Sequence, residues 1–215
     1  VYPLVWISAH LTKLISKKSE NEITREEIIA LASLGHKDGN LFTQENEYLS
    51  NLLRLREIQT EQILTPRSVV HMLSKDITIS EALDDPQTRQ FSRVPIFGED
   101  ADDVLGVVIR AELFEAERLH KGDQRIHECS QPIGRVSEKL PVQNLLDLFI
   151  KQKAHLFLVE DEFGQTSGVV TLEDAIETLL GREIVDETDE VEDMQALAKS
   201  KYRSRLREEK TRVQP

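Results

Sequence analysis

The most informative segment of the sequence is Gly168-Val169-Val170-Thr171-Leu172-Glu173-Asp174-Ala175, in which a short apolar run leads directly into a helical pattern. An apolar run of this kind is typical of a strand that is covered on both faces of its sheet. Thr171 is expected to be the N-cap of the helix and Asp174 to complete the cap, because Thr-x-x-Asp is a capping pattern. The segment therefore predicts a buried strand followed by a capped helix.

An internal repeat surrounds this segment. Sliding the sequence by 62 residues places Gly106-Val107-Val108 over Gly168-Val169-Val170 and Val94-Pro95-Ile96-Phe97 over Leu156-Phe157-Leu158-Val159, without a gap between them. Upstream of these runs, the two copies align again after a shift of one residue. Each copy predicts the order helix, strand, turn, strand, helix. Because one copy is too small to bury its own core, the two copies imply a pseudo-symmetric pair.

Composition excludes several classes of protein. The chain has 215 residues, of which 39% are hydrophobic, and this size fits one globular domain or two small ones. Its net charge of -12 argues against nucleic acid as a partner, and its single cysteine, Cys129, excludes a disulfide framework or a thiolate metal cage. No apolar run approaches the length that spans a bilayer, about 18 residues. We find no nucleophile–base motif, phosphate-binding glycine loop or metal-type histidine spacing, so we do not expect an enzyme.

The region from Thr24 to about Ile63 has a helical pattern throughout. Thr24-Arg25-Glu26-Glu27 predicts a capping box, Gly35 is expected to end the first helix, and Thr43 is expected to cap a second one. Numerous glutamates cover the side of these helices opposite the apolar residues. They indicate a solvated face, although a metal-binding role is the alternative.

The two ends of the chain have strongly biased composition. Residues 1–18 combine Tyr2 and Trp6 with three later lysines, a pattern typical of a helix that leaves a membrane on its cytoplasmic side. The same residues also have the apolar spacing of an amphipathic helix, and the sequence leaves both interpretations open. Residues 183–193 are rich in carboxylates without the ligand alternation of a calcium loop, and a basic stretch follows them.

The start of the helix after Gly168-Val169-Val170 is a candidate anion site. A helix N-terminus offers free N–H groups and a positive dipole end to a phosphate, and the Thr171 hydroxyl adds a donor. Asp174 could accept both hydroxyls of a ribose. Arg93, with Ser92 beside it, lies just before an apolar strand of the other repeat and could supply the cation for the phosphates. The alternative is that Thr171 and Asp174 only cap the helix.

Together these motifs resemble a CBS-domain pair (a Bateman module), and more narrowly the cytosolic region of the cyclin M/CorC (hemolysin-like, DUF21-CBS) family of magnesium transporters. The resemblance implies an α+β fold with an N-terminal helical bundle followed by a tandem CBS-domain pair. It is carried by Thr65-Pro66-Arg67, Ser92-Arg93-Val94-Pro95, Gly168-Val169-Val170-Thr171-Leu172-Glu173-Asp174-Ala175-Ile176-Glu177 and Glu183-Ile184-Val185-Asp186-Glu187-Thr188-Asp189. The implied boundaries are a juxtamembrane helix at 1–18, an acidic helical bundle at 19–63, CBS domain 1 at 64–126, CBS domain 2 at 127–182, and an acidic connector with a basic tail at 183–215.

The resemblance also implies a ligand and partners. The family's CBS pair binds Mg-ATP, forms a homodimer and is joined to a transmembrane DUF21 domain at the cytoplasmic face of the membrane, so ATP would be coupled to dimer conformation and to magnesium transport. Magnesium is expected to arrive on the phosphates rather than in a protein cage. The alternative is a dimerisation or interaction scaffold that binds no nucleotide. By resemblance, the adenine would lie against Thr65, Phe91 and Val169, the ribose against Asp174, and the phosphates against Ser92, Arg93 and Thr171.

The two repeats differ at the residues that would hold the nucleotide. The first repeat has Ile109 where the second has Thr171, and Glu112 where the second has Asp174. We therefore expect one competent nucleotide site per chain rather than two.

Overall fold

The structure is a computed structural model that describes residues 23–182. These residues belong to two compact units, the first ending at Leu49 and the second beginning at Ser50. The helix expected at 1–18 and the acidic connector and basic tail expected at 183–215 lie outside the described residues. Among the residues that are described, no helix is long and apolar enough to cross a membrane.

Helix α2 (Arg25–Lys37) begins at the predicted capping box. The Glu27 amide donates to the Thr24 hydroxyl at 3.2 Å, and the Glu27 carboxylate accepts from the Thr24 amide at 2.9 Å. The prediction that Gly35 ends this helix is wrong, because the helix continues to Lys37. The residue that takes the positive φ typical of a helix end is Gly39, at +76°, just after the C-cap Asp38.

Helix α3 (Thr43–Arg54) is shorter than the sequence suggested. Thr43 is its first helical residue rather than its cap, and the preceding amide of Phe42 donates to the Glu45 carboxylate at 2.8 Å. The helical pattern to Ile63 is also wrong beyond Arg54, where the chain turns and then forms only a short 3₁₀ helix, η1 (Thr60–Gln62). Leu55, directly after the helix, belongs to the apolar core of the second unit, where it is 1% exposed.

The second unit contains two halves with the same order of elements. The first half comprises β2 (Leu73–Ser74), α4 (Ile79–Asp84), β3 (Arg93–Phe97), β4 (Val104–Ile109) and α5 (Arg110–Arg118). The second half comprises β5 (Gly134–Ser137), α6 (Val142–Gln152), β6 (Leu156–Glu160), β7 (Thr166–Thr171) and α7 (Leu172–Leu180). The predicted order helix, strand, turn, strand, helix is confirmed in both halves. The short strands that precede each first helix, β2 and β5, were missed.

The strand register corrects the repeat alignment. Ile96 faces Gly106 in the first half, whereas Val159 faces Gly168 in the second. The glycines are 62 residues apart, but the strand residues that face them are 63 apart (159 − 96), so the gapless alignment was wrong by one residue along β3 and β6. The cause is the turn between the strands, which covers residues 98–103 in the first half and 161–165 in the second.

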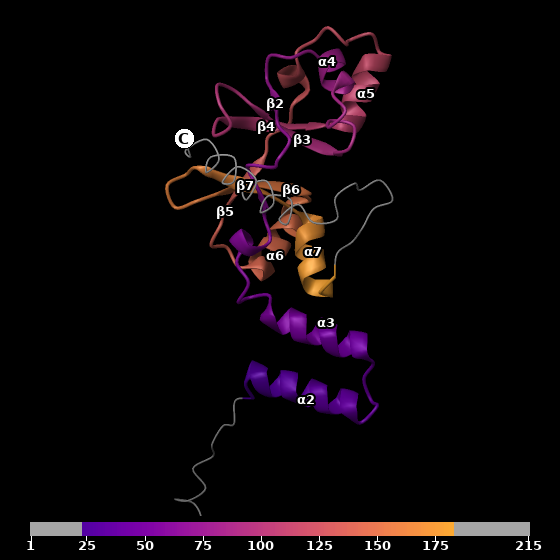
Figure 1. The fold of residues 1–215 in the computed structure, drawn as a ribbon, viewed down its shortest axis with the longest axis vertical. Helices are drawn as coiled ribbons and strands as arrows, with labels where there is room; N and C mark the ends of the chain where they lie inside the picture. The colour runs from indigo at the N-terminus through magenta and orange to yellow at the C-terminus, as the bar shows by residue number, and fades with distance from the viewer. Residues whose placement is uncertain (1–22, 183–215) are drawn as a thin grey trace, which may run out of the picture. The chain divides into compact units, whose positions relative to one another are not determined.

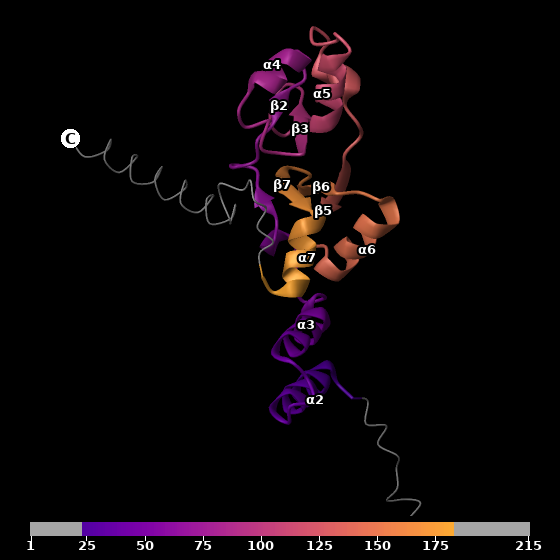
Figure 2. The same ribbon diagram turned by 90° about the vertical axis from the view of Figure 1, so that its right-hand side faces the viewer.

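The two sheets of the second unit lie between two pairs of helices (Figures 1 and 2). Helices α4 and α5 lie beside the sheet β2-β3-β4, and helices α6 and α7 cover the sheet β5-β6-β7 on the side away from the first half. Each half has its own apolar core. A third cluster centred on Val104, Leu158 and Val169 takes residues from both halves and packs them together.

Each half also donates a short edge segment to the other. Strand β1 (Thr65–Pro66) precedes the first half but pairs with β7 in the second, and Gln131 precedes the second half but exchanges two backbone hydrogen bonds with Val107 in the first. Both contacts need a glycine. A Cβ atom on Gly168 would lie 2.1 Å from the Thr65 carbonyl oxygen, and one on Gly106 would lie 2.5 Å from that of Gln131. This close approach explains why the glycine is repeated.

Candidate functional site

The first turn of α7 has the capping geometry expected from the sequence. One carboxylate oxygen of Asp174, Oδ2, accepts hydrogen bonds from the Thr171 amide at 2.7 Å and from the Thr171 hydroxyl at 2.9 Å. The Asp174 amide donates back to the Thr171 hydroxyl at 3.2 Å. Both side chains are partly buried. The predicted N-cap is therefore confirmed.

The cap by itself does not indicate a ligand, because this chain uses it elsewhere. In α4, Glu81 and Thr78 make the same three hydrogen bonds at the same distances of 2.7, 2.9 and 3.2 Å. The α4 carboxylate is exposed, and its hydrogen bonds to Thr78 lower the pKa of Glu81. What distinguishes α7 is its position directly after β7, the strand that is paired with β1.

The β1–β7 pair brings four of the candidate residues close together. Thr65 faces Val169 across the two strands, and Val169 is separated from Thr171 by one residue of β7. Val169 is 6% exposed, within the apolar cluster between the halves, and Thr65 is partly buried. Thr65, Val169, Thr171 and Asp174 therefore lie on one edge of the second half.

The other three candidate residues lie at the start of β3 in the first half. Arg93 faces Ile109 across the β3–β4 pair, and the Ser92 carbonyl accepts from the Arg110 amide at 3.0 Å. The partly buried guanidinium of Arg93 has no hydrogen bond or ion pair with any residue in the range 23–182. An arginine in this condition can bind an anion without first breaking an internal ion pair.

Phe91 is held by residues that the sequence did not indicate. Its ring stacks on His71 with the centroids 6.1 Å apart, and it packs against the core of the first half. His71 in turn places Nε2 3.0 Å from the hydroxyl of the fully buried Thr88 and 3.4 Å from a carboxylate oxygen of Asp85. Sequence spacing gave no signal for this cluster, because it forms only when the segment between α4 and β3 folds back over His71.

The equivalent position in the first half lacks the capping arrangement. Ile109 precedes α5 and offers no side-chain hydrogen bond to the helix. Glu112 instead accepts a hydrogen bond from the Gln131 side chain at 2.8 Å. The two helix starts thus differ in geometry as they do in sequence.

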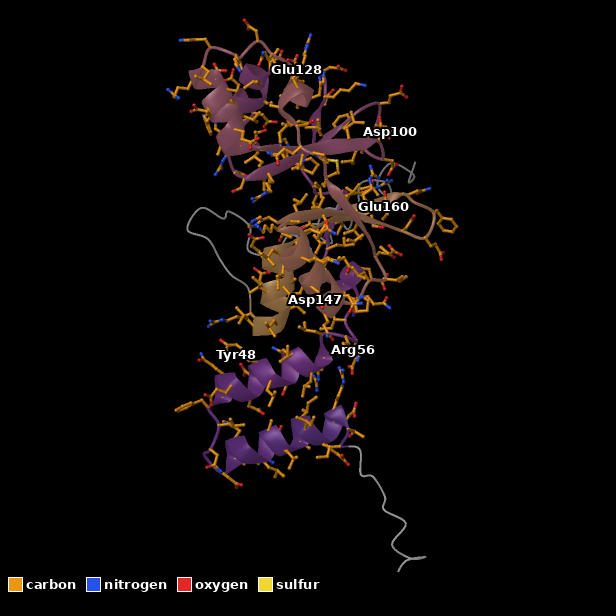
Figure 3. All side chains as sticks on the ribbon, turned by 180° about the vertical axis from the view of Figure 1, so that it is seen from behind. Tyr48, Arg56, Asp100, Glu128, Asp147 and Glu160 are labelled. Carbon is orange, nitrogen blue, oxygen red and sulfur yellow. The ribbon has the colours of Figure 1, made fainter. Side chains whose placement is uncertain are left out.

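Polar contacts of the β3–β4 turn and of the start of β4 join the halves. Asp102 forms an ion pair with Arg67 and accepts from the Thr166 amide at 3.3 Å. Arg135 pairs with Glu160 and donates to the Val104 carbonyl at 2.7 Å. Figure 3 locates Asp100 on the β3–β4 turn and Glu160 at the end of β6. These contacts link the first half, which contains Arg93, to the second half, which contains Asp174.

The chemistry of the site suits an anionic ligand better than a bare metal ion. Within residues 23–182, no group of three or more His, Cys, Asp or Glu side chains could hold a metal. Burial raises the pKa of the Cys129 thiol, which opposes its use as a thiolate ligand. A helix N-terminus, a hydroxyl, a carboxylate and an arginine are groups that together could recognise a phosphorylated sugar.

Comparison with known proteins gives three informative matches. The CBS-domain family profile matches residues 126–181. A UPF0053 protein of Synechocystis is 34% identical over 207 residues, which are 96% of this chain and 60% of that protein. The magnesium and cobalt efflux protein CorC of Escherichia coli is 29% identical, over 88% of this chain and 63% of its own length. The chain thus spans less than two thirds of these curated relatives.

A solved structure is also similar. It is the CBS domain of a bacterial CNNM/CorC family Mg²⁺ transporter in complex with ATP, and it has 31% sequence identity and a TM-score of 0.62. The similarity covers 65% of this chain and 99% of that one.

Proposed function

Because the chain belongs to the CNNM/CorC family of CBS-domain proteins, we propose that it is the regulatory part of a divalent-cation transporter and that it binds Mg-ATP. The single observation that carries the proposal is the pairing of β1 with β7 at the capped start of α7. This pairing gathers Thr65, Val169, Thr171 and Asp174 on one edge of the second half. The ATP complex of a similar CBS domain supports the choice of nucleotide.

Each residue has a role in the proposed complex. Thr65, Phe91 and Val169 contact the adenine, and Asp174 accepts hydrogen bonds from the ribose hydroxyls. The phosphates are bound by Thr171 and the positive dipole end of α7, together with Ser92 and with Arg93, which has no ion pair within residues 23–182. Magnesium would arrive on the phosphate oxygens and would keep several of its water ligands.

The proposal extends to the whole protein. A transmembrane DUF21 domain would place this chain at the cytoplasmic face of a membrane, and the domain boundaries are those inferred from the sequence. Two chains would form a homodimer through their CBS pairs. ATP would regulate transport only if it binds one dimer conformation more tightly than another, since a ligand shifts an equilibrium only by its difference in affinity. The role is binding rather than catalysis.

The experiment is a calorimetric titration of the 215-residue chain with ATP, with and without magnesium. We expect one ATP per chain, bound more tightly with magnesium present. Asp174→Ala should weaken binding about 10-fold to 100-fold, because hydrogen bonds to a charged group contribute roughly 1.5–3 kcal/mol.

A matched control separates loss of the ligand contact from loss of the helix cap. Glu81→Ala removes a cap with the same hydrogen-bond distances from α4, so its ATP affinity should equal that of the wild type. An equal loss of ATP affinity in the two variants would show that the effect of Asp174→Ala comes from removing a helix cap and not from removing a contact with the ribose. No binding by the wild type at millimolar ATP would refute the proposal and favour the nucleotide-free scaffold.

A further inference from the structure

The C-terminal end of α7 makes a specific contact with helix α3. The Asn51 side-chain amide donates to the Leu179 carbonyl at 3.2 Å. The carbonyls of a last helical turn have no partner within the helix, so this bond satisfies one of them. Gly181, the C-cap, has φ +69°, and a Cβ atom there would lie 2.6 Å from the Asn51 nitrogen. The end of α7 therefore has both the conformation and the space that Asn51 requires.

The same helix carries the proposed nucleotide site at its other end. Helix α7 has nine residues and is therefore about 13 Å long. Thr178 donates from its hydroxyl to the Asp174 carbonyl at 2.8 Å, which links the first turn to the next. Ala175 is fully buried in the core of the second half. A short, packed helix of this kind moves as one body, so a displacement at Thr171 and Asp174 reaches Leu179.

The chain that follows Asn51 also returns to the site. Leu55 is buried in the second-half core, and the Thr60 amide and hydroxyl both donate to the Leu140 carbonyl, at 2.9 and 2.7 Å. The Val142 amide donates to the Ile58 carbonyl at 2.9 Å. Strand β1 begins five residues after Thr60. The first residue of segment 51–66 therefore contacts the C-terminal end of α7. The last residues of the segment, β1, pair with β7, the strand that contains Val169.

We propose that Asn51 is a positioning residue that couples nucleotide occupancy at the start of α7 to helix α3 at its end. This inference rests on the proposed function. A ribose that bonds to Asp174 uses the same carboxylate whose Oδ2 accepts the two capping hydrogen bonds from Thr171. The first turn of α7 then adjusts, and the Leu179 carbonyl moves relative to Asn51. Because coupling between two binding events is reciprocal, the Asn51 contact changes nucleotide affinity by the factor with which the nucleotide changes that contact.

The test is hydrogen exchange of the amides from Ser50 to Leu55 in the full 215-residue chain, with and without saturating Mg-ATP, combined with calorimetry. In the wild type, we expect ATP to slow exchange in this segment by about 5-fold, at the lower end of typical coupling factors. Asn51→Ala should abolish the change while ATP still binds, with an affinity weaker by a similar factor. Asn144→Ala, the same change at an exposed asparagine of α6, should behave as the wild type.

The outcomes separate this inference from the proposed function. If the wild type binds ATP but exchange from Ser50 to Leu55 is unchanged, the coupling through Asn51 is refuted and nucleotide binding stands. If Asn51→Ala keeps the wild-type ATP response, the coupling is likewise refuted. If the wild type binds no ATP, the proposed function and the coupling are both refuted.

Discussion

Arg93 is set apart by its surroundings rather than by its residue type. Arg67, Arg118 and Arg135 each pair with a carboxylate, whereas the side chain of Arg93 has no such partner within residues 23–182. An unpaired guanidinium that is partly buried at the edge of a strand stabilises the ligand-free protein little. We therefore expect the Arg93 guanidinium to bind an anion.

Arg93→Ala should therefore weaken ATP binding by about 10-fold or more, since a charge-assisted contact contributes roughly 1.5–3 kcal/mol. The thermal midpoint without ligand should not change. The loss should shrink as salt is added, because salt screens the attraction to phosphate. Titration calorimetry at two salt concentrations measures both the loss of ATP affinity and its dependence on salt. Arg118→Ala, which removes an arginine from an exposed ion pair on α5, is the control, and an equal loss of affinity in this variant would contradict the assignment.

Single-residue predictions from the sequence were good where the interaction is local. The caps at Thr24 and Thr171 depend on residues three apart in one helix, and both are confirmed. The stop at Gly35 was wrong because a glycine permits a left-handed conformation without requiring it. The His71–Phe91 contact was missed because no local pattern records it.

At the scale of elements, the pairing of β1 with β7 connects the fold to the proposed site. The two-residue strand β1 places Thr65 opposite Val169, and it can do so only because Gly168 has no side chain. Without this strand, the edge of the second half beside α7 would lose Thr65. The repeated glycine is thus a requirement of close backbone approach.

Gly168→Ala should destabilise the chain by about 1–3 kcal/mol, as forced overpacking does, and should also weaken ATP binding by displacing Thr65. Gly35→Ala is the contrasting substitution, because its Cβ would meet only the Leu41 side chain, at 3.4 Å or more. It should stabilise α2 by about 0.5–1 kcal/mol and leave ATP binding unchanged. Urea unfolding followed by circular dichroism, with parallel calorimetry, measures both variants. Unaltered stability of Gly168→Ala would show that β1 can shift without cost.

On the scale of the whole molecule, the first half has large apolar side chains that are exposed and do not belong to its core. Phe114 lies in the middle of α5 and Leu119 directly follows this helix, and they are 50% and 51% exposed. Large exposed apolar side chains can mark an interaction surface. They support the proposed homodimer through α5.

Sedimentation velocity of the 215-residue chain should accordingly show a dimer at micromolar concentration. Phe114→Glu should shift it to the monomer, because a charge placed in an apolar interface loses its hydration without gaining a partner. Ile150→Glu changes a more exposed apolar side chain, on α6, which is 68% exposed, and should leave the dimer intact. A monomeric wild type would contradict the dimer, and dissociation of both variants would place the interface elsewhere.

The sequence alone was sufficient for the existence of the repeat, the order helix, strand, turn, strand, helix in each half and the caps at Thr24 and Thr171, because each depends on residue spacing within a short segment. It was also sufficient for the family, whose motifs are contiguous. It was not sufficient for the exact strand register or for the start of α3. Three-dimensional packing was needed to find the exchange of β1 and Gln131 between halves, the contact of Asn51 with Leu179, and the lack of an ion-pair partner for Arg93 among the residues that the structure describes. These features join residues far apart in the chain, for example 128 positions apart for Asn51 and Leu179. Contacts of this kind exist only after distant segments of the chain have packed together.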